Sequence, residues 1–174
     1  MIEIKIVNTS IEHLLPADFS DQSRIWVYQA NRIFSLSEAL QLENELEEFA
    51  KGWRSHGAPV KAKAFLFFGQ FIVFMVDETH VQVGGCSTDS SVHFIKELEN
   101  KYRVSLLDRT QLAFIVKEKV QLLPLAQFPY AVEQKFIDEE TLYFNNIVST
   151  KKELIEQWVV PIKNSWLKQK VNLS

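Results

Sequence analysis

The spacing of apolar and polar residues predicts a strand followed by a helix in the first third of the chain. Residues 24–30 are rich in β-branched and aromatic side chains, which is typical of a strand. Ser35 and Glu38 then form a capping box, the arrangement that begins many helices. Apolar residues recur every three or four positions after it, opposite a run of glutamates, until Gly52. We therefore expect an amphipathic helix that begins at Ser35.

The middle of the chain predicts a hairpin. Residues 60–68 and 71–77 are two strand-like runs, and Gly69 and Gln70 between them suit a two-residue turn. Both runs are apolar on both faces, so both faces of the resulting sheet are expected to be covered.

A second helix and a further strand are expected after this hairpin. Residues 81–85 are compatible with a short strand, and Asp89 or Ser90 can cap a helix. Residues 112–116 have the composition of the next strand. The apolar face of this second helix would consist of Val92, Ile95, Leu98 and Tyr102.

This order of elements predicts an α+β fold of the ferredoxin-like type. Residues 24–117 spell β-α-β-β-α-β, the split βαβ pattern, and would form one four-stranded antiparallel sheet with both helices on one face. Since parallel crossovers are right-handed, the strands at 24–30 and 60–68 should run the same way, with 71–77 between them. We expect residues 1–174 to form a single domain.

The C-terminal extension, residues 121–170, is expected to cover the second face of the sheet. It contains a helix-compatible segment interrupted by Pro129, a short strand within 141–148 and a T-x-x-E capping box at Thr150. The helix after this box should be kinked or divided at Pro161 and should bury Trp158.

Composition limits the classes of function. The net charge of −3 provides no global attraction to phosphate backbones, so nucleic acid is not an expected partner. No stretch approaches the ~18 apolar residues of a membrane span, so no membrane partner is expected either. The single cysteine excludes an internal disulfide and favours a cytoplasmic location. No cofactor motif is present, and the four histidines lack the spacing of a metal site.

The polar stretch 84–91 is the main candidate for a ligand site. Glycines allow close approach to the backbone, and a helix N-terminus favours an anion. His56 and Arg54 lie in a loop expected at the same end of the sheet. The predicted site for a small anion or peptide carboxylate consists of Gly85, Cys86, Ser87, Thr88, Ser90, Ser91, His56 and Arg54. Ordinary turn and helix-capping roles explain the same residues.

Two other classes of function remain open from the sequence. A thiolate near a helix N-terminus is a nucleophile, so Cys86, His56 and Asp77 are the candidate catalytic residues of a cysteine-dependent enzyme. A lone cysteine is more often a small buried side chain than a nucleophile. The third hypothesis is a structural homodimer without a ligand, formed through a sheet edge or the C-terminal helices.

Several segments resemble an uncharacterised bacterial family whose members often carry an automatic label of ABC transporter ATPase. The resemblance lies at residues 26–32, at His56 and Gly57, at 85–92 and at 158–166. The residues do not support the label. A phosphate-binding loop requires Lys and Ser or Thr where Ala58 and Pro59 stand, and the resemblance implies no established activity.

Overall fold

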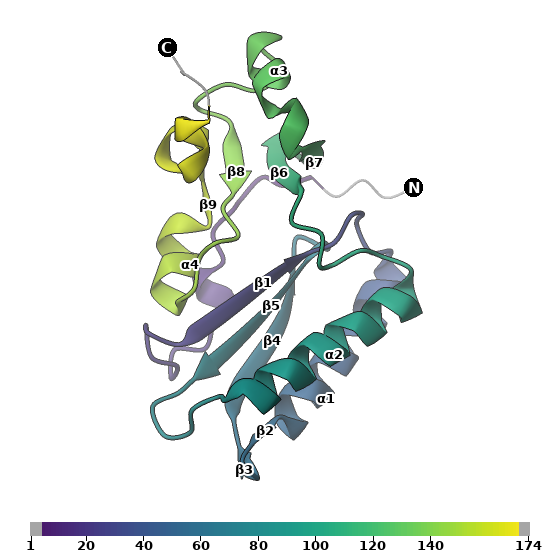
Figure 1. Cartoon of the computed structure of the whole chain (residues 1–174), viewed down its shortest axis with the longest axis vertical. Coiled ribbons are helices and arrows are strands. Elements are labelled where there is room, and N and C mark those ends of the chain that lie inside the picture. The colour runs from purple at the N-terminus through teal and green to yellow at the C-terminus, as the bar shows by residue number, and fades with distance from the viewer. Residues whose placement is uncertain (1–4, 171–174) are drawn as a thin grey trace. The chain divides into compact units, whose positions relative to one another are not determined.

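The computed structural model describes residues 5–170, which divide into two compact units (Figure 1). We call residues 15–108 and 148–154 the two-helix unit, and residues 5–14, 109–147 and 155–170 the four-strand unit. The described residues contain four α-helices and three antiparallel sheets. The predicted α+β class is therefore confirmed. None of these helices is both long and apolar enough to cross a membrane.

The sheet of the two-helix unit has three strands. They are β1 (Arg24–Gln29), β4 (Lys61–Phe67) and β5 (Phe71–Asp77), and their order is β1-β5-β4. β5 is antiparallel to both neighbours. The predicted arrangement, with the third strand between the first two and antiparallel to them, is confirmed.

Both helices of this unit pack on one face of the sheet (Figure 1). They are α1 (Leu36–Gly52) and α2 (Gly85–Tyr102). Their apolar sides meet alternate strand residues, and the rings of Phe49 and Phe94 stack at 4.3 Å between centroids to join the two helices. Burying each such side chain contributes about 1.5–3 kcal/mol. The shared core includes Tyr28, Leu42, Leu46, Ile72, Phe74, Val76, Ile95 and Leu98.

The capping box predicted at the start of α1 is present. The Ser35 side chain accepts from the Glu38 N–H, and the Glu38 carboxylate accepts from the Ser35 N–H. Arg32 binds both carboxylate oxygens of Glu38 at 2.9 Å. These contacts, the Arg32 hydrogen bond above all, lower the pKa of Glu38 to about 2.

The predicted fourth strand of this sheet belongs elsewhere. β6 (Gln111–Val116) pairs with β7 (Lys119–Pro124) and with β8 (Leu142–Phe144) in a separate sheet of order β7-β6-β8-β9. The prediction of one four-stranded sheet over residues 24–117 is therefore wrong. β7 follows β6 after a two-residue turn, and strands that are consecutive in the sequence usually pair with each other.

That turn explains why sequence patterns missed β7. Lys117 and Glu118 occupy it with φ of 51° and 64°, the positive values of a type I′ hairpin turn. Asn and Gly are the residues that normally mark such a turn.

The hairpin between β4 and β5 also differs from its prediction. Its positive-φ residues are Phe68 and Gly69, one position earlier than expected.

The rest of the four-strand unit surrounds its own apolar cluster. α3 (Phe128–Glu133) begins with a proline in its first turn, where no intrahelical N–H is needed. The helix expected across Pro161 is absent: α4 (Lys151–Gln157) ends before it, and β9 (Val159–Pro161) follows. Proline is tolerated at the end of an outer strand. The cluster includes Phe114, Phe128, Ala131, Tyr143, Ile162 and Leu167.

One short C-terminal segment, residues 148–154, joins the two-helix unit. Ile25 N donates to Ser149 O at 2.9 Å, at the start of β1. The ammonium group of buried Lys151 donates to Pro16 O and Phe19 O, each at 2.9 Å. Trp158 is buried, as predicted. Cover of the second sheet face by the whole C-terminal extension stays a prediction.

Short elements complete the described chain. They are two further strands, β2 (Arg54–Ser55) and β3 (Ala58–Pro59), and four 3-10 turns, η1 (Glu12–Leu14), η2 (Leu125–Gln127), η3 (Ile162–Asn164) and η4 (Trp166–Gln169). The pair β2 and β3 positions the site described next.

Candidate functional site

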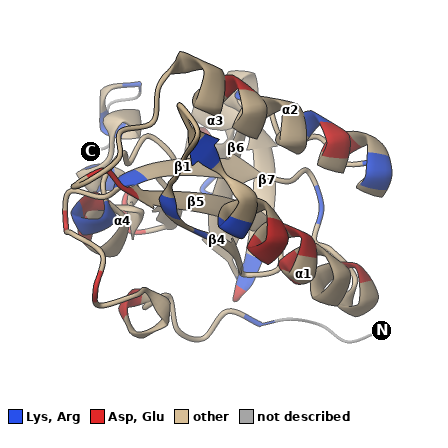
Figure 2. Ribbon diagram, turned by 90° about the horizontal axis from the view of Figure 1, so that it is seen from below, with Lys and Arg blue, Asp and Glu red and all other residues tan. Residues whose placement is uncertain are grey.

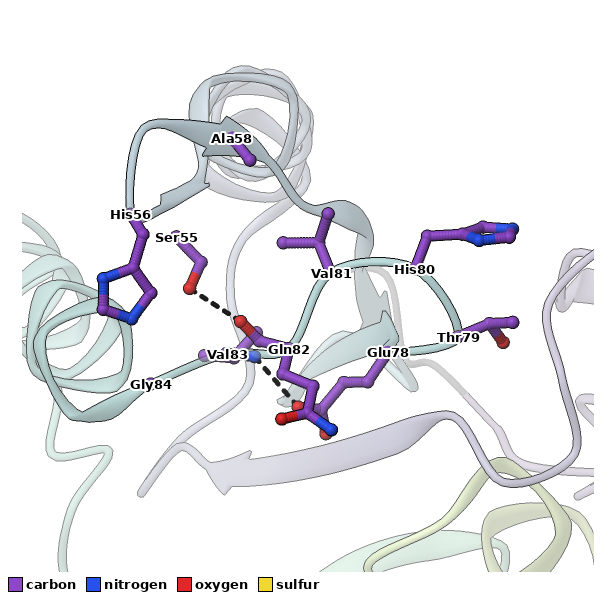
Figure 3. A pocket seen from close by; sticks show the side chains of 10 residues that line it. All are labelled: Ser55, His56, Ala58, Glu78, Thr79, His80, Val81, Gln82, Val83 and Gly84. Atoms are coloured by element: carbon purple, nitrogen blue, oxygen red, sulfur yellow. Dashed lines mark hydrogen bonds between the residues drawn. The ribbon is translucent and has the colours of Figure 1, made fainter.

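An open cavity of about 600 Å³ lies in the two-helix unit (Figure 3). One side consists of Ser55, His56 and Ala58 from the β2–β3 hairpin. The other consists of the consecutive residues 78–84, which connect β5 to α2. Because two segments distant in sequence form its walls, the cavity is a property of the tertiary structure.

The β2–β3 hairpin holds His56 at the cavity wall. His56 and Gly57 form its two-residue turn, with φ of 50° and 80°. Positive φ at both positions matches a type I′ turn, and the glycine accepts this conformation without strain. The sequence analysis expected His56 to lie in a loop and did not predict this hairpin. The His-Gly pair was the signal that could have found it.

Side-chain hydrogen bonds fix the 78–84 segment. Glu78 Oε2 accepts from Val83 N at 2.9 Å, and Ser55 Oγ donates to Gln82 O at 2.6 Å (Figure 3). The first bond closes the segment on itself, and the second ties it to the hairpin. The strand predicted over residues 81–85 is not formed, since these contacts replace strand pairing.

The segment ends where α2 begins, and His56 lies against that point. Gly84 is the N-cap of α2 and provides no side-chain cap. A Cβ built on Gly84 would lie 3.3 Å from His56 Nε2. The first amides of an α-helix lack intrahelical acceptors and carry partial positive charge. The imidazole therefore lies beside a helix terminus that attracts negative groups.

The 84–91 stretch is not the loop that the sequence predicted. α2 starts at Gly85, earlier than the expected cap at Asp89 or Ser90, so the stretch forms the first turns of the helix. All four of its serine and threonine hydroxyls donate to backbone carbonyls. The pairs are Ser87 with Arg54 O, Thr88 with Gly84 O, Ser90 with Ser87 O and Ser91 with Thr88 O.

These bonds change what the predicted residues can do. With their protons donated to carbonyls, the hydroxyls stabilise the helix start and its contact with Arg54. Of the predicted binding residues, only His56 lines the cavity; Arg54, Gly85, Cys86 and the hydroxyl residues do not. What remains within the cavity for an anion is His56 and the backbone of Gly84, which directly precedes the first amides of α2.

The three candidate catalytic residues occupy different settings. Cys86 is exposed in the first turn of α2, not buried. Asp77 is buried, and its carboxylate accepts from the Thr79 hydroxyl, Thr79 N and Ser20 N. These bonds, led by the one from the Thr79 hydroxyl, lower the pKa of Asp77 to about 2. Asp77 thus holds two loops in place and makes no hydrogen bond to His56.

The remaining ionisable groups of the cavity are the carboxylate of Glu78 and the imidazoles of His56 and His80. Glu78 lies 3.9 Å from the Arg24 guanidinium, a half-exposed pair that reduces its negative field. The imidazoles of His56 and His80 lie at opposite ends of the cavity (Figure 3). Within residues 5–170, neither of them makes a hydrogen bond. No group of three or more His, Cys, Asp or Glu side chains in this range could hold a metal ion.

Comparison with models of protein families, with curated proteins and with solved structures finds no match to this chain. The assignment of a function therefore depends on the geometry of the cavity.

Proposed function

We propose that this protein is a non-catalytic binding module that holds a small anion, such as a phosphate or a carboxylate, at the His56 end of the cavity. The approach of His56 to Gly84 carries the proposal. A ligand at this point would meet an imidazole donor and the amides of a helix N-terminus together.

The size and openness of the cavity suit a small ligand or the end of a peptide. The Glu78 carboxylate accepts from Val83 N, one residue before Gly84. An anion is therefore expected on the hairpin side of Gly84, toward His56 and away from this carboxylate. Hydrogen bonds to a charged group contribute about 1.5–3 kcal/mol each, so a site with few such donors binds weakly.

Thermal unfolding with added sulfate, phosphate or acetate tests the proposal, with chloride at equal ionic strength as the reference. We expect sulfate and phosphate to raise the melting temperature of the wild type. His56→Asn should lose this effect, because asparagine tolerates the positive φ of 50° but removes the imidazole. His80→Asn, at the other end, should retain it. Absence of any anion effect on the wild type would exclude the site.

The exposure of Cys86 favours a second candidate, a cysteine-dependent enzyme with His56 as base. Its nucleophile would be the thiolate, which reacts with iodoacetamide below pH 8. Rapid alkylation of the wild type at pH 6–7, with slower alkylation of His56→Asn, would support the enzyme. Equally slow alkylation of both proteins would argue against the enzyme and favour the binding module.

Three broader proposals accompany this function. The order β1-α1-β4-β5-α2 and the central antiparallel strand support a relationship to ferredoxin-like sandwiches that lack the fourth strand. The single exposed cysteine supports a cytoplasmic location. Membership of the bacterial family that the sequence resembles is proposed on the segments around His56 and Gly85.

A further inference from the structure

β4 is an outer strand of the three-stranded sheet. The order β1-β5-β4 leaves it with one strand neighbour in the part of the chain that the structure describes. It extends over seven residues. Proteins usually shield such an edge by making the strand short or by placing proline or charge on it. β4 contains no proline, and its charges, Lys61 and Lys63, lie in its first half.

The second half of β4 is apolar and only half-buried. Ala64, Phe65 and Leu66 are each partly exposed, whereas every residue of the neighbouring β5 is buried. The rings of Phe65 and Phe67 stack with centroids 5.1 Å apart. An additional strand at this edge would remove apolar surface from water and satisfy backbone groups.

The positions of the two lysines select how a second copy could pair. Two identical antiparallel strands meet about a two-fold axis, so the axis position fixes every opposite pair. An axis at Lys63 places Lys63 opposite itself, and one at Ala62 places Lys61 opposite Lys63. Like charges directly opposite each other are destabilising.

An axis at Ala64 avoids both arrangements. It pairs all seven residues of β4 and places Lys63 opposite Phe65 of the second copy. An ammonium group beside an aromatic ring is a favourable contact. Opposite residues point to the same face, so the helices of both copies would cover the same side of the combined sheet.

We propose that this protein forms a homodimer in which the β4 strands of two copies pair antiparallel about Ala64. The dimer contains one continuous sheet formed from both three-stranded sheets. The anion site is a separate proposal, and neither depends on the other.

Sedimentation measurements and a disulfide test examine this dimer. The wild type should have twice the monomer mass of 20.2 kDa. In Ala64→Cys/Cys86→Ser the new thiols face each other across the axis, at a separation compatible with a disulfide, and mild oxidation should give a covalent dimer. Ala62→Cys/Cys86→Ser is the matched control, because residue 62 faces Leu66 and should not cross-link. A monomeric wild type, or equal cross-linking at residue 62, overturns the proposal.

A charge exchange tests the same register without a disulfide. Phe65→Lys places a lysine opposite Lys63 of the second copy and should give a monomer. Adding Lys63→Glu to this variant creates opposite charges at the same place and should restore the dimer. Circular dichroism melting checks that both variants fold. A Phe65→Lys variant that stays dimeric, or a folded double variant that stays monomeric, contradicts pairing about Ala64.

Discussion

His56 Nε2 lies 3.3 Å from the position that a Cβ would take on Gly84. This separation is tighter than most contacts of real side chains, so Gly84→Ala should displace the imidazole and weaken anion binding. Alanine is also a poor N-cap, and we expect a loss of about 0.5–1 kcal/mol in the free energy of unfolding. Urea titration and sulfate-dependent melting measure the two effects.

The adjacent glycine provides the control. A Cβ on Gly85 would meet nothing within 4 Å, and Gly85 lies inside α2. Gly85→Ala should therefore stabilise the protein by up to about 1 kcal/mol, because alanine favours the helix, and should leave sulfate binding intact. Equal loss of sulfate binding in both variants would argue against a specific contact at Gly84.

Lys151 should be a strong determinant of stability. Its buried ammonium group donates to the carbonyls of Pro16 and Phe19. Lys151→Met would leave both carbonyls without this donor, and we expect a loss of about 1–3 kcal/mol. Lys152→Met changes an exposed neighbour and should alter stability by less than about 0.5 kcal/mol. Urea unfolding midpoints compare the two, and similar midpoints would contradict the buried contact.

Asp77 should make stability depend on acid pH. Its pKa of about 2 lies below the usual 3.8, because Thr79 and Ser20 donate to the folded carboxylate. The unfolded chain therefore binds a proton first as the pH falls. The stabilisation, of about 2 kcal/mol, is complete above pH 5 and is lost as the pH falls through about 4 toward 2.

Asp77→Asn isolates this contribution. The variant should be less stable than the wild type at pH 7, and the difference should shrink toward pH 2. Urea unfolding at pH 7, 4 and 2.5 measures it. Glu43→Gln, at an exposed position on α1, is the control and should show no comparable trend. A difference that stays constant over this range would exclude the assigned role of the carboxylate.

The β6–β7 turn offers a stabilising change. Lys117 and Glu118 adopt φ of 51° and 64°, which non-glycine residues disfavour. Lys117→Asn with Glu118→Gly supplies the residues that a type I′ turn prefers and should raise the melting temperature, by the equivalent of about 1 kcal/mol. Gly57→Ala, at φ of 80° with no atom within 4 Å of the new Cβ, should lower it through backbone strain alone. Calorimetry should show a higher melting temperature for the first variant and a lower one for Gly57→Ala.

The local signals in the sequence proved informative where they involve few neighbouring residues. The Ser35 capping box, the apolar stripe of α1 and the two long runs of β4 and β5 were each predicted, because helix caps and side-chain periodicity depend on short stretches. The handedness rule then placed β5 between its neighbours. The same reasoning failed at β6, where the competing partner β7 follows a turn with no glycine.

The candidate site was predictable only in part. His56 was singled out because it lies in a loop expected near residues 84–91, and the structure places it beside Gly84. The serines and threonines were misjudged because Ser87 Oγ finds its acceptor on Arg54, a residue far away in the sequence. Composition identifies a hydroxyl, but only its neighbours decide whether its proton is available.

The sequence by itself determined the α+β class, the starts of α1 and α4, and the central antiparallel hairpin, because periodicity and capping act over a few residues. Only the tertiary structure decided that β6 leaves the first sheet and that α2 starts at Gly85. It also decided that the β2–β3 hairpin and the 78–84 segment enclose a cavity. These outcomes depend on which distant segments pair with the same backbone groups. A local sequence pattern does not contain that information.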